Sequence, residues 1–221
     1  MNSKIIWGLM FLVLVAFGTL SVKIWQLEGK IDMMDGTTGG AITSFSGEDE
    51  KDLDGEPVMG DADAPVTIIA FGDYECPYCK RFHTQTFSQL KIAYIDTGKV
   101  RYVARNFPLS FHQYANQAAA ASECALQENR FWEYHDLLYT HQDLSQRNLV
   151  ALAKNVGIDP IKFEKCLGDP VISQKVLEDI RSGERFGVSG TPAFLINGEL
   201  VSGAQPFNAI AMIIDSKIAE K

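Results

Sequence analysis

The chain has 221 residues, of which 46% are hydrophobic, and a formal net charge of −8 at neutral pH. This length and composition are enough for one core-forming domain of ordinary size and a membrane anchor besides. The acidic balance argues against nucleic acid and against anionic lipid surfaces as binding partners.

The N-terminus carries a continuous apolar stretch from Ile5 to Val22, with Lys4 before it and Lys23 after it. Its length is close to the lower bound for a membrane-spanning helix. The alternative is a signal peptide cleaved after the small residues of Ala16-Phe17-Gly18. Because the stretch has no polar break, we expect residues 1–25 to form an uncleaved signal-anchor helix.

Residues 26–56 are polar and acidic and contain few large apolar side chains. Gly36-Thr37-Thr38-Gly39-Gly40 interrupts any helix that continues from the anchor, and Glu48-Asp49-Glu50-Lys51-Asp52 is a cluster of charge. Such a composition cannot bury a core, so it predicts a flexible acidic linker.

Residues 57–221 have the apolar patterns of a folded α/β domain. The first half predicts a strand at Val66–Phe71, a helix at Pro77–Ile95 that ends before Gly98, and a strand at Val100–Phe107. An alanine-rich, breaker-punctuated region then predicts helices inserted over about residues 111–186. These helices are expected at Tyr114–Gln127, Phe131–Thr140, Gln146–Val156, Pro160–Leu167 and Pro170–Phe186.

The C-terminal part predicts two short strands, Ala193–Ile196 and Leu200–Ser202, joined by an Asn197-Gly198 turn. Asn-Gly between apolar runs is a strong hairpin signal. A final helix is expected over about residues 206–219.

Two cysteines follow the first strand in the sequence Cys76-Pro77-Tyr78-Cys79. Two thiols at this spacing can close a small disulfide ring and open it again. Cys76 would lie at a helix N-terminus, where backbone N–H groups and the helix dipole favour a thiolate. We therefore expect Cys76 to be an exposed nucleophile and Cys79, one turn into the helix, to be a shielded resolving thiol. The alternative for such a pair is half of a zinc site.

Thr191-Pro192 precedes the short strand at Ala193–Ile196. A proline there has no N–H to donate to a sheet. If its peptide bond is cis, the Thr191 backbone can face a substrate peptide in extended form. The alternative is an ordinary loop proline, because few X–Pro bonds are cis.

These motifs together resemble the DsbA-like thiol-disulfide oxidoreductases of bacterial envelopes, which belong to the thioredoxin-like family. The resemblance spans roughly Pro57 to the C-terminus. It implies a thioredoxin-like α/β fold with an inserted helical domain, here preceded by the transmembrane helix. The matching stretches are Asp63–Ile69, Phe71–Cys79, Phe131–Asp136 and Gly187–Pro192.

The resemblance implies that Cys76 and Cys79 introduce disulfides into exported proteins by dithiol–disulfide exchange. Thr191, Pro192, Pro77 and Tyr78 would then contact the substrate. A membrane redox partner would reoxidise the pair, and no cofactor, metal or nucleic acid is implied. We expect a bacterial cell-membrane protein with its catalytic domain on the extracytoplasmic side, because disulfides persist there.

The sequence departs from the family at Ala70, six residues before Cys76. Thioredoxin-like proteins commonly carry a buried acid at this position, which can exchange the proton of the resolving thiol. Glu75 or water could substitute for it, although we expect Asp73 and Glu75 to be solvated loop acids.

Cys124 and Cys166 lie in the predicted helical insertion. Because a C-x-x-C pair closes on itself most easily, we expect these two to form a structural disulfide. Two buried free thiols are the alternative.

Two other functions are consistent with the same residues. One is a reductase or isomerase on the same fold, supplied with electrons across the membrane. The other is a structural domain in which the four cysteines hold zinc, although a second C-x-x-C is missing.

Overall fold

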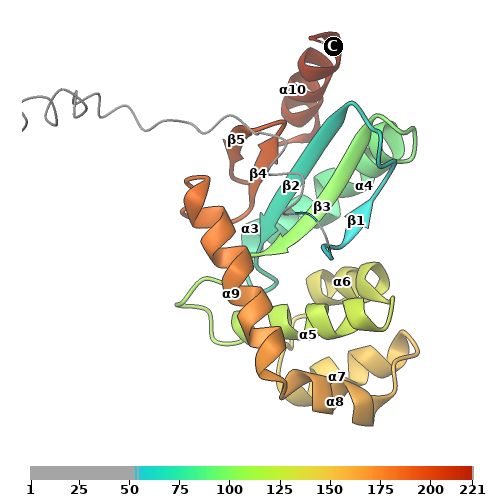
Figure 1. Ribbon diagram of the computed structural model, residues 1–221, viewed down its shortest axis with the longest axis vertical. Helices are drawn as coiled ribbons and strands as arrows, with labels where there is room; N and C mark the ends of the chain where they lie inside the picture. Colours follow the sequence, from blue (N-terminus) through green and yellow to red (C-terminus); the bar gives the residue numbers. More distant parts are fainter. Residues whose placement is uncertain (1–52, 54, 221) are drawn as a thin grey trace, which may run out of the picture. The chain divides into compact units, whose positions relative to one another are not determined.

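The computed structural model describes residue 53 and residues 55–220, and their centre is a five-stranded sheet (Figure 1). The strand order is β1-β3-β2-β4-β5. β2 and β3 are parallel, and every other neighbouring pair is antiparallel. The strands are β1 (Val58–Met59), β2 (Val66–Gly72), β3 (Val100–Asn106), β4 (Ala193–Ile196) and β5 (Glu199–Ser202).

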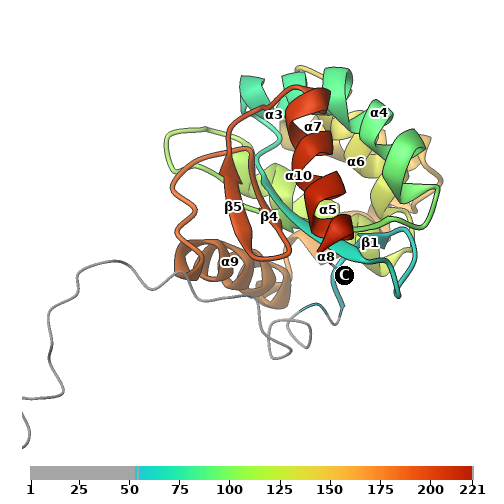
Figure 2. The same cartoon turned by 90° about the horizontal axis from the view of Figure 1, so that it is seen from above.

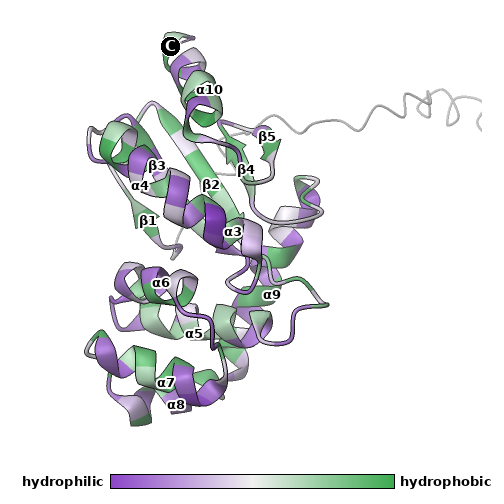
Figure 3. Cartoon of the chain, turned by 180° about the vertical axis from the view of Figure 1, so that it is seen from behind, coloured by the Kyte–Doolittle hydropathy of each residue, from purple (hydrophilic) through white to green (hydrophobic). Residues whose placement is uncertain are grey.

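The central strands are buried on both faces of the sheet, since every residue of β4 and every residue of β2 except Gly72 is buried. Alternate side chains point to opposite faces. Ile68 packs beneath a layer of helices that includes α10 (Phe207–Ala219), whereas Ile69 packs on the side of α9 (Pro170–Arg185). Figure 2 shows α10 and α9 on the two sides of the strands, and in Figure 3 β2 and β4 have mostly the hydrophobic colour.

The helix predicted after the cysteine pair is one continuous helical segment with two π-helical turns. Its end at Ile95 is the predicted one. Its parts are α3 (Pro77–Phe82), η1 (His83–Phe87), α4 (Ser88–Leu90) and η2 (Lys91–Ile95).

Helices α5 to α9 lie between β3 and β4 in the chain, as the sequence predicts for the insertion. They have a hydrophobic cluster of their own, centred on Tyr134, Leu138, Leu149 and Phe163. The first four of these helices are α5 (Ala115–Gln127), α6 (Phe131–Thr140), α7 (Gln146–Asn155) and α8 (Pro160–Leu167).

A disulfide joins two helices of the insertion. Cys124 in α5 and Cys166 in α8 are bonded, with a sequence separation of 42. The alternative, in which Cys124 and Cys166 are buried free thiols, is therefore wrong.

The β4–β5 hairpin turns at Asn197-Gly198, and both residues have positive φ, +45° and +85°. That backbone conformation is the one that Asn-Gly hairpin turns adopt. β1 was not expected from the sequence, because two residues are too few to show an alternating pattern.

The predicted anchor, residues 1–25, lies outside the described residues, as does most of the predicted linker. Within the described part of the chain, no helix has both the length and the apolar character needed to cross a bilayer. The linker prediction is wrong at its end. Leu53 is buried in the cluster that contains Ile69, and the Glu56 carboxylate is paired with Arg105. The folded domain therefore begins before Pro57.

Candidate active site

The cysteine pair lies where β2 passes into α3. Cys76 is the N-cap residue of α3, with extended backbone (φ −67°, ψ 122°), and Pro77 occupies the first turn. A proline fits there because the N–H it lacks would have no helical partner. The Cys76 carbonyl accepts the N–H of Lys80, which closes the first helical turn. Cys79 lies inside that turn, so both sulfurs are held at the N-terminal end of the helix.

The loop before β4 brings Thr191 and Pro192 to the cysteine pair. The Thr191–Pro192 peptide bond is cis. Cys76 Sγ lies 3.5 Å from the Thr191 carbonyl oxygen, to which the thiol donates a hydrogen bond when it is protonated. The structure therefore joins two predicted site segments that are 115 residues apart in the chain.

Cys76 was expected to be exposed, but in the structure it is buried. Its exposed fraction is 3%, against 2% for Cys79, and neither is disulfide-bonded. Both side chains pack against Tyr74 and the hydrophobic cluster of the insertion, which the local sequence around the motif does not reveal. We expect reaction at Cys76 to require a small displacement of these neighbours.

The two thiols have opposite proton affinities. A hydrogen bond from the Cys79 thiol, and further bonds from the backbone of the first helical turn, lower the pKa of Cys76 to about 5, although burial opposes them. Burial, followed by the hydrogen bond to Cys76 and its charge, raises the pKa of Cys79 well above that of an ordinary thiol. At neutral pH, Cys76 is therefore a thiolate and Cys79 is a thiol.

Pro77 and Tyr78 are both on the surface. Tyr78 is 56% exposed, and the Arg81 guanidinium carbon lies 5.1 Å from the centre of its ring. An exposed aromatic side chain next to the reactive sulfur offers an apolar contact to an incoming peptide.

Asp73 is not the solvated loop acid that we expected, since it is only 2% exposed. Its Oδ1 accepts the backbone N–H of Glu75 at 2.7 Å and of Cys76 at 3.2 Å. Its Oδ2 accepts the N–H of Leu109 and lies 2.7 Å from His112 Nδ1. Asp73 thus fixes the loop that carries Cys76 to the segment that leads into the insertion.

Glu75 also has a structural contact, because its Oε2 accepts the N–H of Tyr114 at 2.6 Å, immediately before α5. Asp73 forms an Asx turn, in which an aspartate carboxylate accepts the N–H groups two and three residues further along the chain. An aspartate shortly before a predicted helix start is a sequence signal for this turn. That signal could have identified Asp73, whereas the partners of Glu75 and His112 depend on the tertiary fold.

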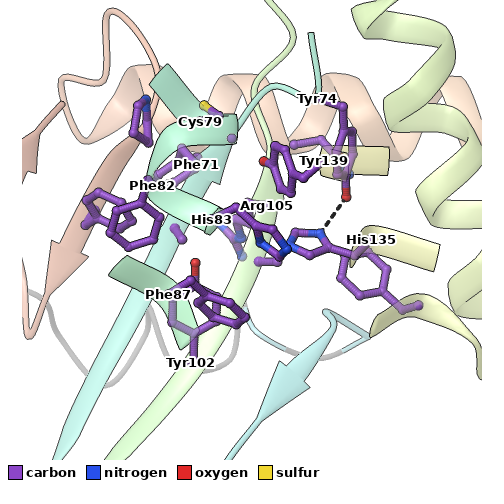
Figure 4. Close-up of a pocket in the computed structure, with 17 residues that line it drawn as sticks. Phe71, Tyr74, Cys79, Phe82, His83, Phe87, Tyr102, Arg105, His135 and Tyr139 are labelled. Carbon is purple, nitrogen blue, oxygen red and sulfur yellow. Dashed lines mark hydrogen bonds between the residues drawn. The ribbon is translucent and has the colours of Figure 1, made fainter. Parts of the chain in front are cut away.

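A small cavity lies behind Cys79 (Figure 4). The volume open to the centre of a water molecule is about 30 Å³. In its wall, the Tyr74 hydroxyl is 2.8 Å from His135 Nδ1, and burial lowers the pKa of His135 to about 3. The lining also includes Ala70, Phe82, His83, Tyr102, Arg105, Tyr139 and Pro192.

A cluster of buried charges, which the sequence analysis missed, lies between the sheet and the insertion. Arg105 Nη2 is 3.3 Å from Glu56 Oε1, and Lys175 Nζ is 3.2 Å from Asp179 Oδ1. Asn106 donates to Asp179 through its backbone and to Glu123 through its side chain, at 2.9 and 2.6 Å. These residues are far apart in the sequence, so no local motif marks them.

Comparison with known proteins agrees with this geometry. The family model described as thioredoxin matches residues 52–216, which is most of the chain. The chain belongs to the thioredoxin family. Within it, disulfide bond formation protein D of Bacillus subtilis is 29% identical over 182 residues, covering 78% of this chain and 81% of that protein.

The crystal structure of oxidised BdbD from Bacillus subtilis superposes with a TM-score of 0.68 at 29% identity, covering 76% of this chain and 95% of that one. The paired thiols and the Thr191 contact thus belong to a thioredoxin fold that carries a helical insertion.

Some relatives are much longer than this chain. A protein named Na(+)/H(+) antiporter NhaA 3, from Salinispora tropica, is 36% identical over 170 residues. The match covers 76% of this chain but only 26% of the antiporter. The chain thus spans about a quarter of such relatives.

Proposed function

We propose that this protein is a DsbA-like thiol-disulfide oxidoreductase that introduces disulfides into exported proteins, with Cys76 as the nucleophile and Cys79 as the resolving thiol. The observation that carries the proposal is the difference between the two thiols. The low pKa of Cys76 means that its thiolate, and so the reduced form of the pair, is stabilised, which makes the disulfide form a stronger oxidant.

The reaction consists of two exchanges. A substrate thiolate attacks Cys76 Sγ of the Cys76–Cys79 disulfide, so that a substrate–Cys76 disulfide forms and Cys79 leaves as a thiolate that takes up a proton. A second substrate thiolate then attacks the substrate sulfur of this mixed disulfide. The substrate disulfide forms, Cys76 leaves as a thiolate, and the enzyme is reduced by two electrons.

The substrate contacts that we propose are Thr191 and Pro192 on one side of Cys76 and Pro77 and Tyr78 on the other. The 3.5 Å distance between Cys76 Sγ and the Thr191 carbonyl oxygen supports the first pair, because a peptide bound there would lie beside the reactive sulfur. The exposure of Tyr78 supports the second.

We also propose that residues 1–25 anchor the protein in the bacterial cell membrane, with the rest of the chain on the extracytoplasmic side. The apolar stretch from Ile5 to Val22 supports the anchor. The Cys124–Cys166 disulfide supports an oxidising compartment. After each turnover, a redox partner in the membrane would reoxidise the Cys76–Cys79 pair.

A reductase or isomerase would use the same two sulfurs in the opposite direction. Trapping separates the two directions. A Cys79→Ala variant cannot resolve a mixed disulfide internally, so it should accumulate client proteins bound to Cys76, and Cys76→Ala is the matched control. The variant is used in two forms: with Cys76 carried as a mixed disulfide with glutathione, from which a reduced client displaces glutathione, and with Cys76 as the free thiolate, which attacks a client disulfide. Clients that are trapped only when their cysteines begin reduced support the oxidase. Clients that are trapped only from an oxidised state contradict it.

The zinc hypothesis needs all four cysteines as thiolates. Because Cys124 and Cys166 are bonded to each other, that four-cysteine site is not formed.

A further inference from the structure

The exchange reaction requires a group that moves a proton to and from Cys79. Burial raises the pKa of Cys79, so its thiolate must be protonated when it leaves and its thiol must be deprotonated before it attacks. Ala70 on β2 pairs with Ala104 on β3, so neither of these strand positions provides a carboxylate. The proton must therefore pass through water or another side chain.

The cavity behind Cys79 also exposes His83 (Figure 4). Cys79 and His83 are four residues apart in one continuous helix, so they lie on the same face, one turn from each other. A water-accessible volume of about 30 Å³ exceeds what one water molecule needs, and the wall carries several polar groups. Water in this cavity could connect the thiol with the imidazole.

His83 in turn reaches the solvent through Asp136. Its Nε2 lies 3.2 Å from Asp136 Oδ1, and the two side chains are 11% and 62% exposed. The ring stacks on Tyr139 at 4.8 Å and on Phe87 at 5.4 Å between centroids, which fixes its plane. With Nε2 directed at Asp136, the other nitrogen, Nδ1, remains to exchange a proton with the cavity.

The other titratable groups of the cavity are less suited. Burial keeps His135 neutral by lowering its pKa to about 3. Burial also raises the pKa of Tyr139 far above neutral. Histidine is the side chain that ordinarily gains and loses a proton near neutral pH.

We propose that His83 is the proton-transfer residue for Cys79, acting through water in the cavity, with Asp136 linking it to solvent. The inference rests on the proposed thiol–disulfide exchange. When Cys79 leaves as a thiolate, His83 delivers a proton to it and regains one from solvent beside Asp136. When Cys79 attacks Cys76 Sγ, the same proton moves back to His83 and the substrate sulfur leaves as a thiolate.

The pH dependence of this transfer depends on every charged or titratable group around the His83 ring. These are Cys79 in its own helix, Tyr74 in the loop after β2, Tyr102 and Arg105 on β3, and His135, Asp136 and Tyr139 on α6.

The test follows ring closure in the reduced protein. Reduced protein is mixed with oxidised glutathione and quenched in acid at intervals, and mass spectrometry counts the mixed disulfide at Cys76 and the closed Cys76–Cys79 disulfide. In His83→Ala and His83→Gln, we expect the mixed disulfide to form at the wild-type rate. Its closure by Cys79 should be at least about tenfold slower at pH 7.

Two further measurements separate proton transfer from a structural effect. Added imidazole should restore closure in His83→Ala, and Asp136→Asn should slow closure while it leaves the ring in place. His141→Gln, a matched histidine change outside the cavity, should behave as wild type. Closure at the wild-type rate in both His83 variants, or slow closure that imidazole leaves unchanged, would overturn the inference. If the wild-type protein forms no mixed disulfide at all, the proposed function fails instead.

Discussion

At the scale of single residues, the two active-site thiols differ in pKa because they lie at opposite ends of the first turn of one helix. Cys76 receives the hydrogen bond of the Cys79 thiol and those of the first helical turn, while Cys79 lies deeper beside the cavity. The thiolate that does the chemistry is therefore stabilised by its partner as well as by the helix.

A titration of the reduced protein tests this arrangement. The absorbance of the thiolate, or the rate of alkylation of Cys76, should rise with an inflection near pH 5. In Cys79→Ala the inflection should move to higher pH, because the largest stabilising hydrogen bond is lost, whereas Cys79→Ser retains a donor and should shift less. An inflection near pH 8.5 in the wild type, the value of an ordinary thiol, would show that Cys76 is not activated.

The sequence predicts part of this residue-level arrangement. Cys76-Pro77-Tyr78-Cys79 and Thr191-Pro192 are local motifs with a chemical reason behind each, and the structure brings them together. The burial of Cys76 and Asp73 could not be predicted in the same way. Both depend on packing against the insertion, which lies elsewhere in the sequence.

At the scale of secondary-structure elements, α9 can lie close to the sheet because it carries Gly183. A Cβ atom at this position would be 2.8 Å from the ring of Phe107 and 3.1 Å from that of Phe71. The glycine therefore sets how closely the last helix of the insertion approaches β2 and the start of the loop after β3.

The expected result of Gly183→Ala is a net loss of stability. Alanine is the better helix former by about 1 kcal/mol, but overpacking a well-filled core typically costs about 1–3 kcal/mol. We expect the variant to lose up to about 2 kcal/mol in urea unfolding. Gly168→Ala is the control, since its Cβ would make only an ordinary contact at 3.6 Å. If Gly183→Ala is as stable as wild type, the space between α9 and the Phe107 and Phe71 rings is not tightly packed.

Most elements could be predicted from the sequence, because long apolar runs and clear breakers determine them locally. The helix at Phe131–Thr140 and the strand at Ala193–Ile196 have the predicted bounds. The sequence gives no sign of β1, which exists only because β3 offers an edge to pair with. Nor does it mark the π-helical turn at His83–Phe87.

At the scale of the whole molecule, buried charges connect the sheet with the inserted helices. Burial, and then the charge of Asp179, raise the pKa of Glu56 to about 7 and that of Glu123 to about 8. Both carboxyl groups are thus more easily protonated in the folded domain than in the unfolded chain.

This linkage has a definite sign. A carboxyl group with a raised folded-state pKa contributes its stability at low pH and loses it as the pH rises through that pKa. We expect the oxidised protein, whose disulfide-bonded active-site sulfurs do not titrate, to become less stable between about pH 4.5 and pH 8.

Glu123→Gln tests the linkage, because glutamine can still accept the Asn106 hydrogen bond but does not ionise. The variant should be more stable than wild type at pH 8 by at least about 1 kcal/mol, and the difference should vanish near pH 5. Urea unfolding at both values measures this. The same pH dependence in variant and wild type would count against a buried, neutral Glu123.

The proposed oxidase activity requires the Cys76–Cys79 pair to cycle between dithiol and disulfide as an oxidant. The most direct measurement is redox equilibration with glutathione buffers, with mass spectrometry used to locate the disulfide that forms. We predict that Cys76 and Cys79 interconvert while Cys124–Cys166 stays closed. The potential should lie between about −270 mV, the value of thioredoxin, and about −120 mV, the value of DsbA. A potential close to that of thioredoxin, or a pair that does not exchange with glutathione, would contradict the account.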